Sequence, residues 1–205
     1  MPKAFSEKDR QIIKKNLIEQ GKVYFGKYGL KKTIIDDLTK SVGIAKGTFY
    51  SFYKSKEELF LDVLETIERE HVDILAKKIV NPDKSPKQIF KEFIKYRMDV
   101  IENEPIIQML LSSDEMDYLF RALPENARLN RLIHRKIDHE FMMQFTKKWQ
   151  EEGLLKVIDP DILVNMYRIF AVISLGKDHI GKTKYYETID LLIDILVDYL
   201  IIEST

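Results

Sequence analysis

Residues 33–53, TIIDDLTKSVGIAKGTFYSFY, constrain the fold more than any other part of the chain. Apolar residues recur at helical spacing on both sides of Gly43, which can adopt the positive φ angle of a sharp turn at little cost. Thr33 is placed to cap the first helix, and Asp36 three residues later completes a weak form of the capping box. The pattern therefore predicts two short helices joined by a tight turn, with the second helix over about residues 45–52.

The remainder of the chain is predicted to be helical as well, because no segment alternates apolar and polar residues for long enough to require a strand. Proline and glycine punctuate the chain, and Ser55 with Glu58 forms a capping box at the start of a long helix. The expected helices cover about residues 7–28, 56 onward, 86–102, 105–112, 124–152, 160–175 and 184–202, with room for a short helix within 113–123. The predicted fold class is all-α, with about nine to ten helices.

Charge is divided unevenly along the chain. Residues 1–56 contain thirteen Lys/Arg and five Asp/Glu, a net charge of +8, whereas the remaining residues carry a net charge of −8. A basic segment on an acidic body is typical of a protein that binds a polyanion at one end. Chance clustering of solvated lysines is the alternative, so charge alone does not establish nucleic-acid binding.

Other function classes receive little support from the sequence. The absence of cysteine excludes a disulfide framework and a cysteine zinc site, and fits a reducing cytoplasm. The polar N-terminus lacks the apolar core of a secretory signal, and no apolar run is long enough to span a membrane. The histidines are not spaced as a metal-binding pair, and no catalytic triad or phosphate-binding loop is present. We expect no membrane association, no metal, no cofactor and no enzymatic activity.

The two short helices have the geometry of a helix-turn-helix, which places its second helix in the major groove of DNA. Lys46 and Thr48 lie near the start of that helix, where side chains reach base edges, and Gly47 allows a close approach. Tyr50, Lys54 and Lys56 are better placed for phosphates, as are the backbone N–H groups near Thr33. A plain helical hairpin without DNA-binding activity is the alternative interpretation of the same pattern.

Residues 10–65 resemble the DNA-binding domain of the tetracycline-repressor (TetR) family. The resemblance is carried by Tyr24-Phe25, Gly29, Thr33, Asp37-Leu38, Gly43-Ile44, the run Lys46-Gly47-Thr48-Phe49-Tyr50, and the run from Lys54 to Leu59. Thr39 and Val42 stand where the family usually has alanine, and Tyr53 stands where it usually has phenylalanine. Beyond about residue 65, only chain length and helix pattern resemble the family.

The resemblance implies a transcriptional regulator with a helix-turn-helix domain at residues 1–56 and an effector-binding and dimerisation domain at residues 57–205. It implies that Thr33 and Tyr50 contact phosphates, and that Ala45, Lys46 and Thr48 meet bases. It also implies a homodimer formed through the last two helices. Apolar residues on those helices supply the candidate interface: Ile162, Met166, Phe170, Ile173, Ile189, Leu192, Ile193, Leu196 and Leu200.

The effector site is less constrained, because aromatic residues at helical spacing more often pack in a core than line a pocket. Aromatic and Met residues supply the candidates: Tyr96, Met109, Tyr118, Phe120, Met142, Phe145, Trp149, Tyr167 and Phe170. The favoured function is a repressor that a small, largely apolar effector releases from a pseudo-palindromic operator. A DNA-binding regulator controlled by a protein partner, and a helical enzyme built on the same scaffold, are the alternatives.

Overall fold

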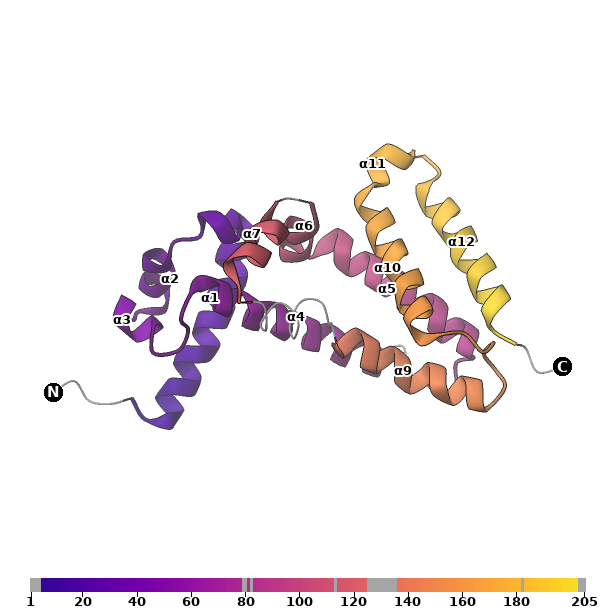
Figure 1. Cartoon of the computed structure of the whole chain (residues 1–205), viewed down its shortest axis with the longest axis horizontal. Helices are drawn as coiled ribbons and strands as arrows, with labels where there is room; N and C mark the ends of the chain where they lie inside the picture. The colour runs from indigo at the N-terminus through magenta and orange to yellow at the C-terminus, as the bar shows by residue number, and fades with distance from the viewer. Residues whose placement is uncertain are drawn as a thin grey trace. The chain divides into compact units, whose positions relative to one another are not determined.

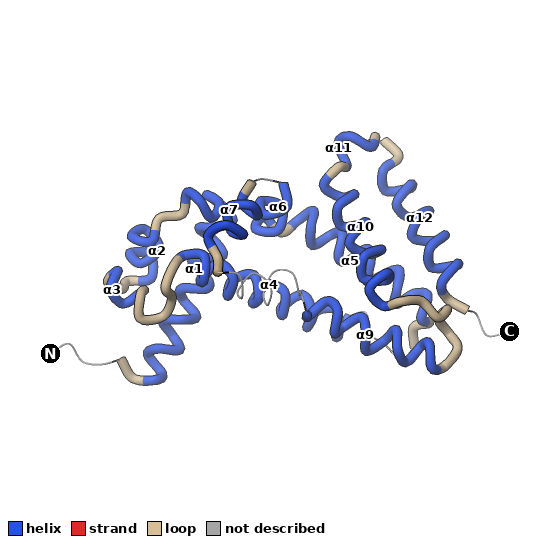
Figure 2. Tube along the Cα trace, in the orientation of Figure 1, coloured by secondary structure: helices blue, strands red, loops and turns tan. Residues whose placement is uncertain are grey.

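The computed structural model describes residues 5–78, 81, 83–112, 114–124, 136–181 and 183–202. These residues form eleven helices and no extended strand, which confirms the predicted all-α class (Figure 2). The helices are α1 Glu7–Lys32, α2 Ile35–Val42, α3 Lys46–Phe49, α4 Lys56–Lys78, α5 Pro86–Asn103, α6 Pro105–Ser112, α7 Glu115–Ala122, α9 Lys136–Glu151, α10 Pro160–Leu175, α11 Lys177–Ile180 and α12 Tyr185–Leu200 (Figure 1).

Most of the predicted helices are confirmed, but two differ in their bounds and one helix was not predicted. Helix α1 continues to Lys32, although its backbone leaves helical geometry at Gly29, where the helix was predicted to end. Helix α3 is shorter than predicted, and α11 was not predicted. The expected helix start at Pro124 cannot be compared, because residues 125–135 lie outside the described residues.

The chain divides into two compact units, each built from two segments. The N-terminal unit comprises Met1–Glu68 and Pro105–His134, and the C-terminal unit comprises Arg69–Glu104 and Arg135–Thr205. This division reflects packing, so the functional boundary expected between residues 56 and 57 stays a prediction.

The N-terminal unit is held together by side chains with no exposed surface. Leu17 and Phe25 of α1 and Leu59 and Phe60 at the start of α4 are all fully buried, and the rings of Phe25 and Phe60 stand edge to face at 5.1 Å. Gly21 allows α1 and α4 to approach closely, because a Cβ atom there would lie 2.9 Å from the Val63 side chain. Helices α6 and α7 pack against α1 and complete the unit.

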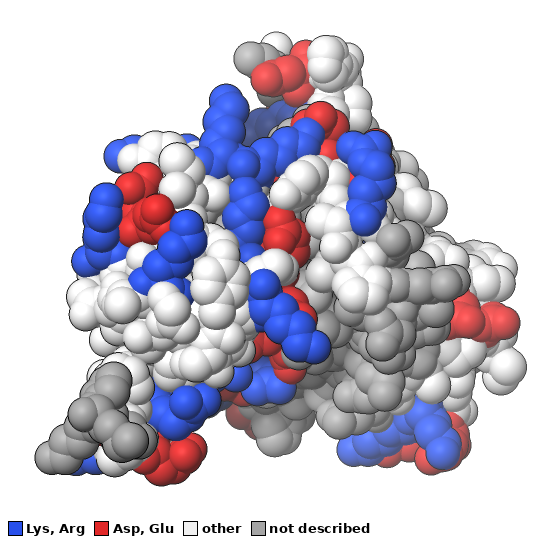
Figure 3. All heavy atoms as spheres, turned by 60° about the vertical axis from the view of Figure 1, so that its left-hand side comes forward, with Lys and Arg blue, Asp and Glu red and all other residues white. Residues whose placement is uncertain are grey.

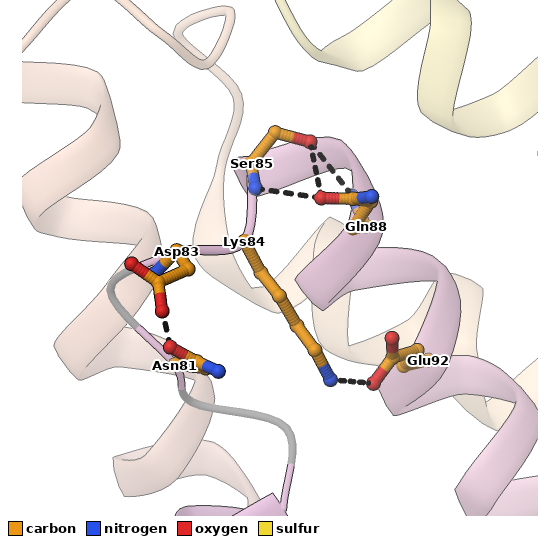
Figure 4. A network of polar contacts seen from close by, with 6 residues as sticks. All are labelled: Asn81, Asp83, Lys84, Ser85, Gln88 and Glu92. Carbon is orange, nitrogen blue, oxygen red and sulfur yellow. Dashed lines mark hydrogen bonds and ion pairs between the residues drawn. The ribbon is translucent and has the colours of Figure 1, made fainter.

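Helix α5 is the centre of the C-terminal unit, and both α10 and α12 pack against it. Ser85 and Gln88 form a reciprocal capping box at the start of α5, and Lys84 pairs with Glu92 one turn further at 2.6 Å (Figure 4). The core of this unit gathers Phe90, Ile94 and Trp149 with apolar residues from α10 and α12.

A ladder of three ion pairs joins α5 to α12 on the surface of the C-terminal unit. The Nζ atoms of Lys87, Lys91 and Lys95 lie 2.6, 2.6 and 2.8 Å from carboxylate oxygens of Asp198, Asp194 and Asp190. The lysines are four residues apart along α5, and the aspartates are four residues apart along α12. The lysine numbers rise as those of their aspartate partners fall, so the two helices are antiparallel. The hydrogen bond from Lys87 lowers the pKa of Asp198 below its usual range.

We expect Lys91→Asp to destabilise the protein by about 1 kcal/mol, because it replaces an attractive pair with two facing carboxylates. Adding Asp194→Lys should recover most of the loss, and 1 M NaCl should shrink both effects by screening. Urea unfolding of the unmodified chain, Lys91→Asp, Asp194→Lys and the double variant measures the coupling free energy of the pair. Lys147→Asp, in an exposed pair within α9, is the control and should change stability by less than about 0.5 kcal/mol.

Candidate nucleic-acid interface

The connection from α1 to α2 does not form the cap that the sequence predicts. The Thr33 hydroxyl is buried and donates a 2.6 Å hydrogen bond to the Gly29 carbonyl oxygen, instead of accepting one from α2. The residue that precedes α2 is Ile34, and no side chain caps the helix there. The predicted box of Thr33 with Asp36 is therefore wrong, because the bend at Gly29 supplies the Thr33 hydroxyl with a nearer partner. The uncapped first turn of α2 retains backbone N–H groups suited to an anion.

The turn after α2 has the geometry that the sequence predicts. Gly43 has φ 74° and ψ 32°, in the left-handed region that favours glycine. Its N–H donates to the Lys40 carbonyl at 3.1 Å, and the Ile44 N–H donates to the Thr39 carbonyl at 3.0 Å. The buried Thr39 hydroxyl, a departure from the family pattern, is satisfied by the Asp36 carbonyl at 3.0 Å.

Helix α3 has only four residues, so its position depends on its side chains. Phe49 has no exposed surface and contacts the ring of Tyr53, which is also buried. From α1, the Arg10 guanidinium lies over the Phe52 ring at 4.7 Å. The opposite side of α3 faces solvent: Ala45, Lys46, Gly47 and Tyr50 are exposed and Thr48 is half-buried.

Lys46 does not stand alone on this surface. Its Nζ lies 2.8 Å from the Asp36 carboxylate on α2, and this hydrogen bond raises the pKa of Lys46. About half of each side chain remains exposed. Sequence reasoning assigned Asp36 to helix capping and missed this pairing. Cationic side chains spread over the N-terminal unit with anionic ones among them (Figure 3).

The two lysines predicted to contact phosphates differ in their surroundings. Lys54 is exposed, whereas the half-buried Lys56 donates to the carbonyl oxygens of Lys31 at 2.8 Å and Thr33 at 3.0 Å. The capping box predicted at the start of α4 is half formed. The Ser55 hydroxyl accepts the Glu58 backbone N–H at 3.3 Å. The Glu58 carboxylate, however, accepts the backbone N–H of Lys54 and not that of Ser55.

An open groove of about 640 Å³ lies beside α2 in the same unit. Tyr24, Tyr28, Lys32, Thr33, Ile34, Asp37, Lys40 and Ser41 line it. None of the predicted effector-pocket residues borders this groove.

Residues 17–63 match the sequence model of the family described as bacterial regulatory proteins, tetR family. An uncharacterised HTH-type transcriptional regulator of Bacillus subtilis, YhgD, is 24% identical over 195 residues, covering 90% of this chain and 94% of that protein. The HTH-type transcriptional repressor SCO4008 of Streptomyces coelicolor is 25% identical, over 76% and 75% of the two chains. The solved structure of a TetR-family regulator from Pectobacterium atrosepticum has a TM-score of 0.70 at 19% identity, covering 98% of this chain and all of that one.

The chain is therefore similar to the TetR family in sequence over residues 17–63 and in fold over almost its whole length. These similarities support a DNA-binding transcriptional regulator and not an enzyme. Among the described residues, no three His, Cys, Asp or Glu side chains are grouped to hold a metal ion. No helix in the described ranges is long and apolar enough to cross a membrane.

The predicted effector-pocket residues fall in both units. Met109, Tyr118 and Phe120 are half-buried in the N-terminal unit. In the C-terminal unit, Trp149 and Phe170 belong to the core, and Tyr96 and Phe145 pack at its edge. The side chains of Met142 and Tyr167 lie outside the described residues.

Two of the candidate tyrosines use their hydroxyl groups inside the protein. Tyr118 donates a 2.7 Å hydrogen bond to Glu57, and this bond, with burial, raises the pKa of Tyr118 to about 12. The Tyr96 hydroxyl lies 2.7 Å from Nδ1 of His71, and burial raises the pKa of Tyr96.

The candidate dimer residues divide into two sets by exposure. Phe170, Ile189, Ile193 and Leu200 are buried within the chain, so they have almost no surface left for a partner. Met166, Ile173 and Leu196 are half-buried, whereas Ile162 and Leu192 are exposed. Tyr199, in the apolar stripe predicted for the last helix, is also exposed, and the outward faces of α10 and α12 carry further exposed residues that the prediction missed: Ile169, Val172, Leu191 and Ile195. Their spacing of three, four or seven residues was the available signal.

Gly43 and Gly47 provide a matched pair of substitutions, because a Cβ atom at either would have no neighbour within 4 Å. We expect Gly43→Ala to destabilise the protein by about 1–2 kcal/mol, since its φ is in the left-handed region. Gly47→Ala should leave stability unchanged or raise it by about 0.5 kcal/mol, since Gly47 is helical. Urea unfolding compares the two; equal losses would contradict the assignment of Gly43 as the obligatory turn residue.

Proposed function

We propose that this chain is a TetR-family homodimeric repressor that binds a pseudo-palindromic operator and is released by a small, largely apolar effector. The observation that carries the proposal is the surface of α3 and of the residue after it. Lys46 and Tyr50 are exposed there, Thr48 is half-buried, and Phe49 on the opposite side is buried. Such a surface fits the major groove, and the repressor named in Streptomyces coelicolor supports the direction of control.

Each residue of this surface has a role set by its chemistry. Lys46 can donate to the O6 and N7 atoms of guanine, and Thr48 can bond a base or pack on a thymine methyl. Tyr50, Lys54 and the first-turn N–H groups of α2 would contact phosphates and fix the register. Lys56 would join them if its ammonium group left the carbonyl oxygens that it now holds. Residues 1–56 would then read the operator, and residues 57–205 would bind the effector and the partner subunit.

A two-fold dimer would place two α3 helices on successive turns of one face of DNA, about 34–36 Å apart or a multiple of that distance. The exposed apolar rows on α10 and α12 support this arrangement, because rows of this length are unusual on a monomer surface. An effector that binds the dimer better when the two α3 helices are off register would release the DNA. Control by a protein partner without a small ligand is the alternative, and compounds that raise the melting temperature while weakening DNA binding would exclude it.

Lys46→Ala should weaken binding to a duplex from the chain's own promoter region by about tenfold, or ~1.4 kcal/mol. If Lys46 reads a base, discrimination between operator variants should fall while the salt dependence of binding stays nearly unchanged. Fluorescence anisotropy at several salt concentrations measures both. Lys147→Ala removes another exposed lysine with a carboxylate neighbour and should bind as the unmodified chain does. Unchanged binding by Lys46→Ala would exclude Lys46 as a reader.

Ile195→Lys should convert the dimer to monomers, because it places a charge in the middle of the exposed row on α12. Ile195 is 57% exposed, so the substitution should leave the fold of the single chain intact. Val157→Lys, at a residue that is 93% exposed and outside both rows, is the control. Analytical ultracentrifugation reports the masses, and a dimer that persists in Ile195→Lys would move the interface elsewhere.

A further inference from the structure

The short connection between α1 and α2 is held by a carboxylate from far along the chain. Glu115, the first residue of α7, is 7% exposed and belongs to the same N-terminal unit. Its two carboxylate oxygens accept the backbone N–H of Lys31 at 3.1 and 3.4 Å. Glu115 and Lys31 are 84 residues apart in the sequence. Removing the Glu115 carboxylate would leave the Lys31 N–H without this acceptor, so the contact has a specific energetic role.

The backbone of α1 is shaped to receive this carboxylate. Gly29 has φ 77° and ψ 166°, which interrupts the helix. A Cβ atom on Gly29 would lie 2.6 Å from Oε1 of Glu115, so any side chain would displace the carboxylate. The Gly29 carbonyl then accepts both the N–H of Thr33 at 3.2 Å and its hydroxyl at 2.6 Å. Glycine is therefore required here for both its backbone angle and its lack of a side chain.

Two further contacts fix the same connection. Lys56 donates to the carbonyl oxygens of Lys31 and Thr33, so the N–H of Lys31 is held by an anion and its C=O by a cation. Asp114, which immediately precedes α7, pairs with the Lys31 side chain, and Tyr118 of α7 donates to the buried Glu57 at the start of α4. Helix α7 thus bonds to the last turn of α1 through Glu115 and to the first turn of α4 through Tyr118.

We propose that Glu115 is a positioning residue for DNA binding: it holds the bend at Gly29 and so sets the direction in which α2 leaves α1. Helix α2 begins two residues after Thr33. A tilt of about 10° at its start would move its far end, where Gly43 leads into α3, by about 2 Å over its ~12 Å length. Base contacts of 2.7–3.2 Å tolerate no such shift. The inference rests on the proposed reading role of α3.

The test compares Glu115→Ala with Glu115→Gln. Glutamine keeps a carbonyl oxygen for the Lys31 N–H, whereas alanine removes the acceptor. We expect Glu115→Ala to lose about tenfold in affinity for the promoter duplex and to speed deuterium exchange in residues 30–34. Glu115→Gln should stay within about threefold of the unmodified chain in both measurements. Asp117→Ala, an exposed acid on the same helix, is the control and should change neither.

Rescue by glutamine separates positioning from a general loss of folding, and stoichiometric titration gives the DNA-competent fraction of each chain. Should Glu115→Ala fail to fold, Glu115→Asp replaces it, since the shorter side chain withdraws the carboxylate from Lys31. Faster exchange with unchanged DNA affinity, or a glutamine variant as weak as the alanine variant, would overturn the proposal. If the unmodified chain binds no promoter fragment, the proposed function fails, whereas exchange at residues 30–34 still reports whether Glu115 holds the bend.

Discussion

Burial of Phe49 is the interaction on which the proposed DNA-reading surface depends. Helix α3 has four residues, far fewer than an isolated helix needs, so it cannot form without a tertiary anchor. Phe49 supplies that anchor from inside the unit, while the residues on the other side of α3 remain exposed. The turn at Gly43 and the Arg10 contact with Phe52 then orient the helix. A reading helix this short gains its rigidity from the unit around it and not from its own hydrogen bonds.

The parts of the fold that could be predicted are those encoded by local signals. Gly43 and Gly153 adopt positive φ angles at the positions where helices were expected to stop, and the proline-led helices α5, α6 and α10 begin where predicted. The residues predicted to read DNA on α3 are exposed or half-buried, and their contact with DNA stays a prediction. The predicted cap at Thr33 was wrong because two local hydrogen bonds compete for its hydroxyl: one to the first turn of α2 and one to the Gly29 carbonyl. The sequence shows that its hydroxyl can bond a nearby backbone group, but the backbone angle at Gly29 decides which one.

The contacts that were missed join segments far apart in the chain. Nothing near Glu115 indicates that it accepts the Lys31 N–H, and nothing near Lys87, Lys91 and Lys95 indicates three aspartates on α12. On α10 and α12, both helix faces are apolar, so periodicity alone could not separate core from surface. Exposure makes the division: Ile193 is fully buried and Ile195, two residues later, is 57% exposed. An interface assignment needs that distinction because only exposed area can be lost to a partner.

The ion pair of Lys46 with Asp36 affects how the proposed reading surface would discriminate between DNA sequences. A carboxylate close to DNA repels phosphates, so Asp36 reduces the sequence-independent part of the affinity. It also competes for Lys46, whose ammonium must exchange this partner for a base or a phosphate when DNA binds. A guanine edge offers two acceptors and can replace the lost ion pair, whereas an adenine or thymine edge replaces it less well. The same carboxylate can accept from a cytosine amino group beside it. If Lys46 reads a base as proposed, its pairing with Asp36 lowers the sequence-independent affinity and strengthens the preference for a guanine edge.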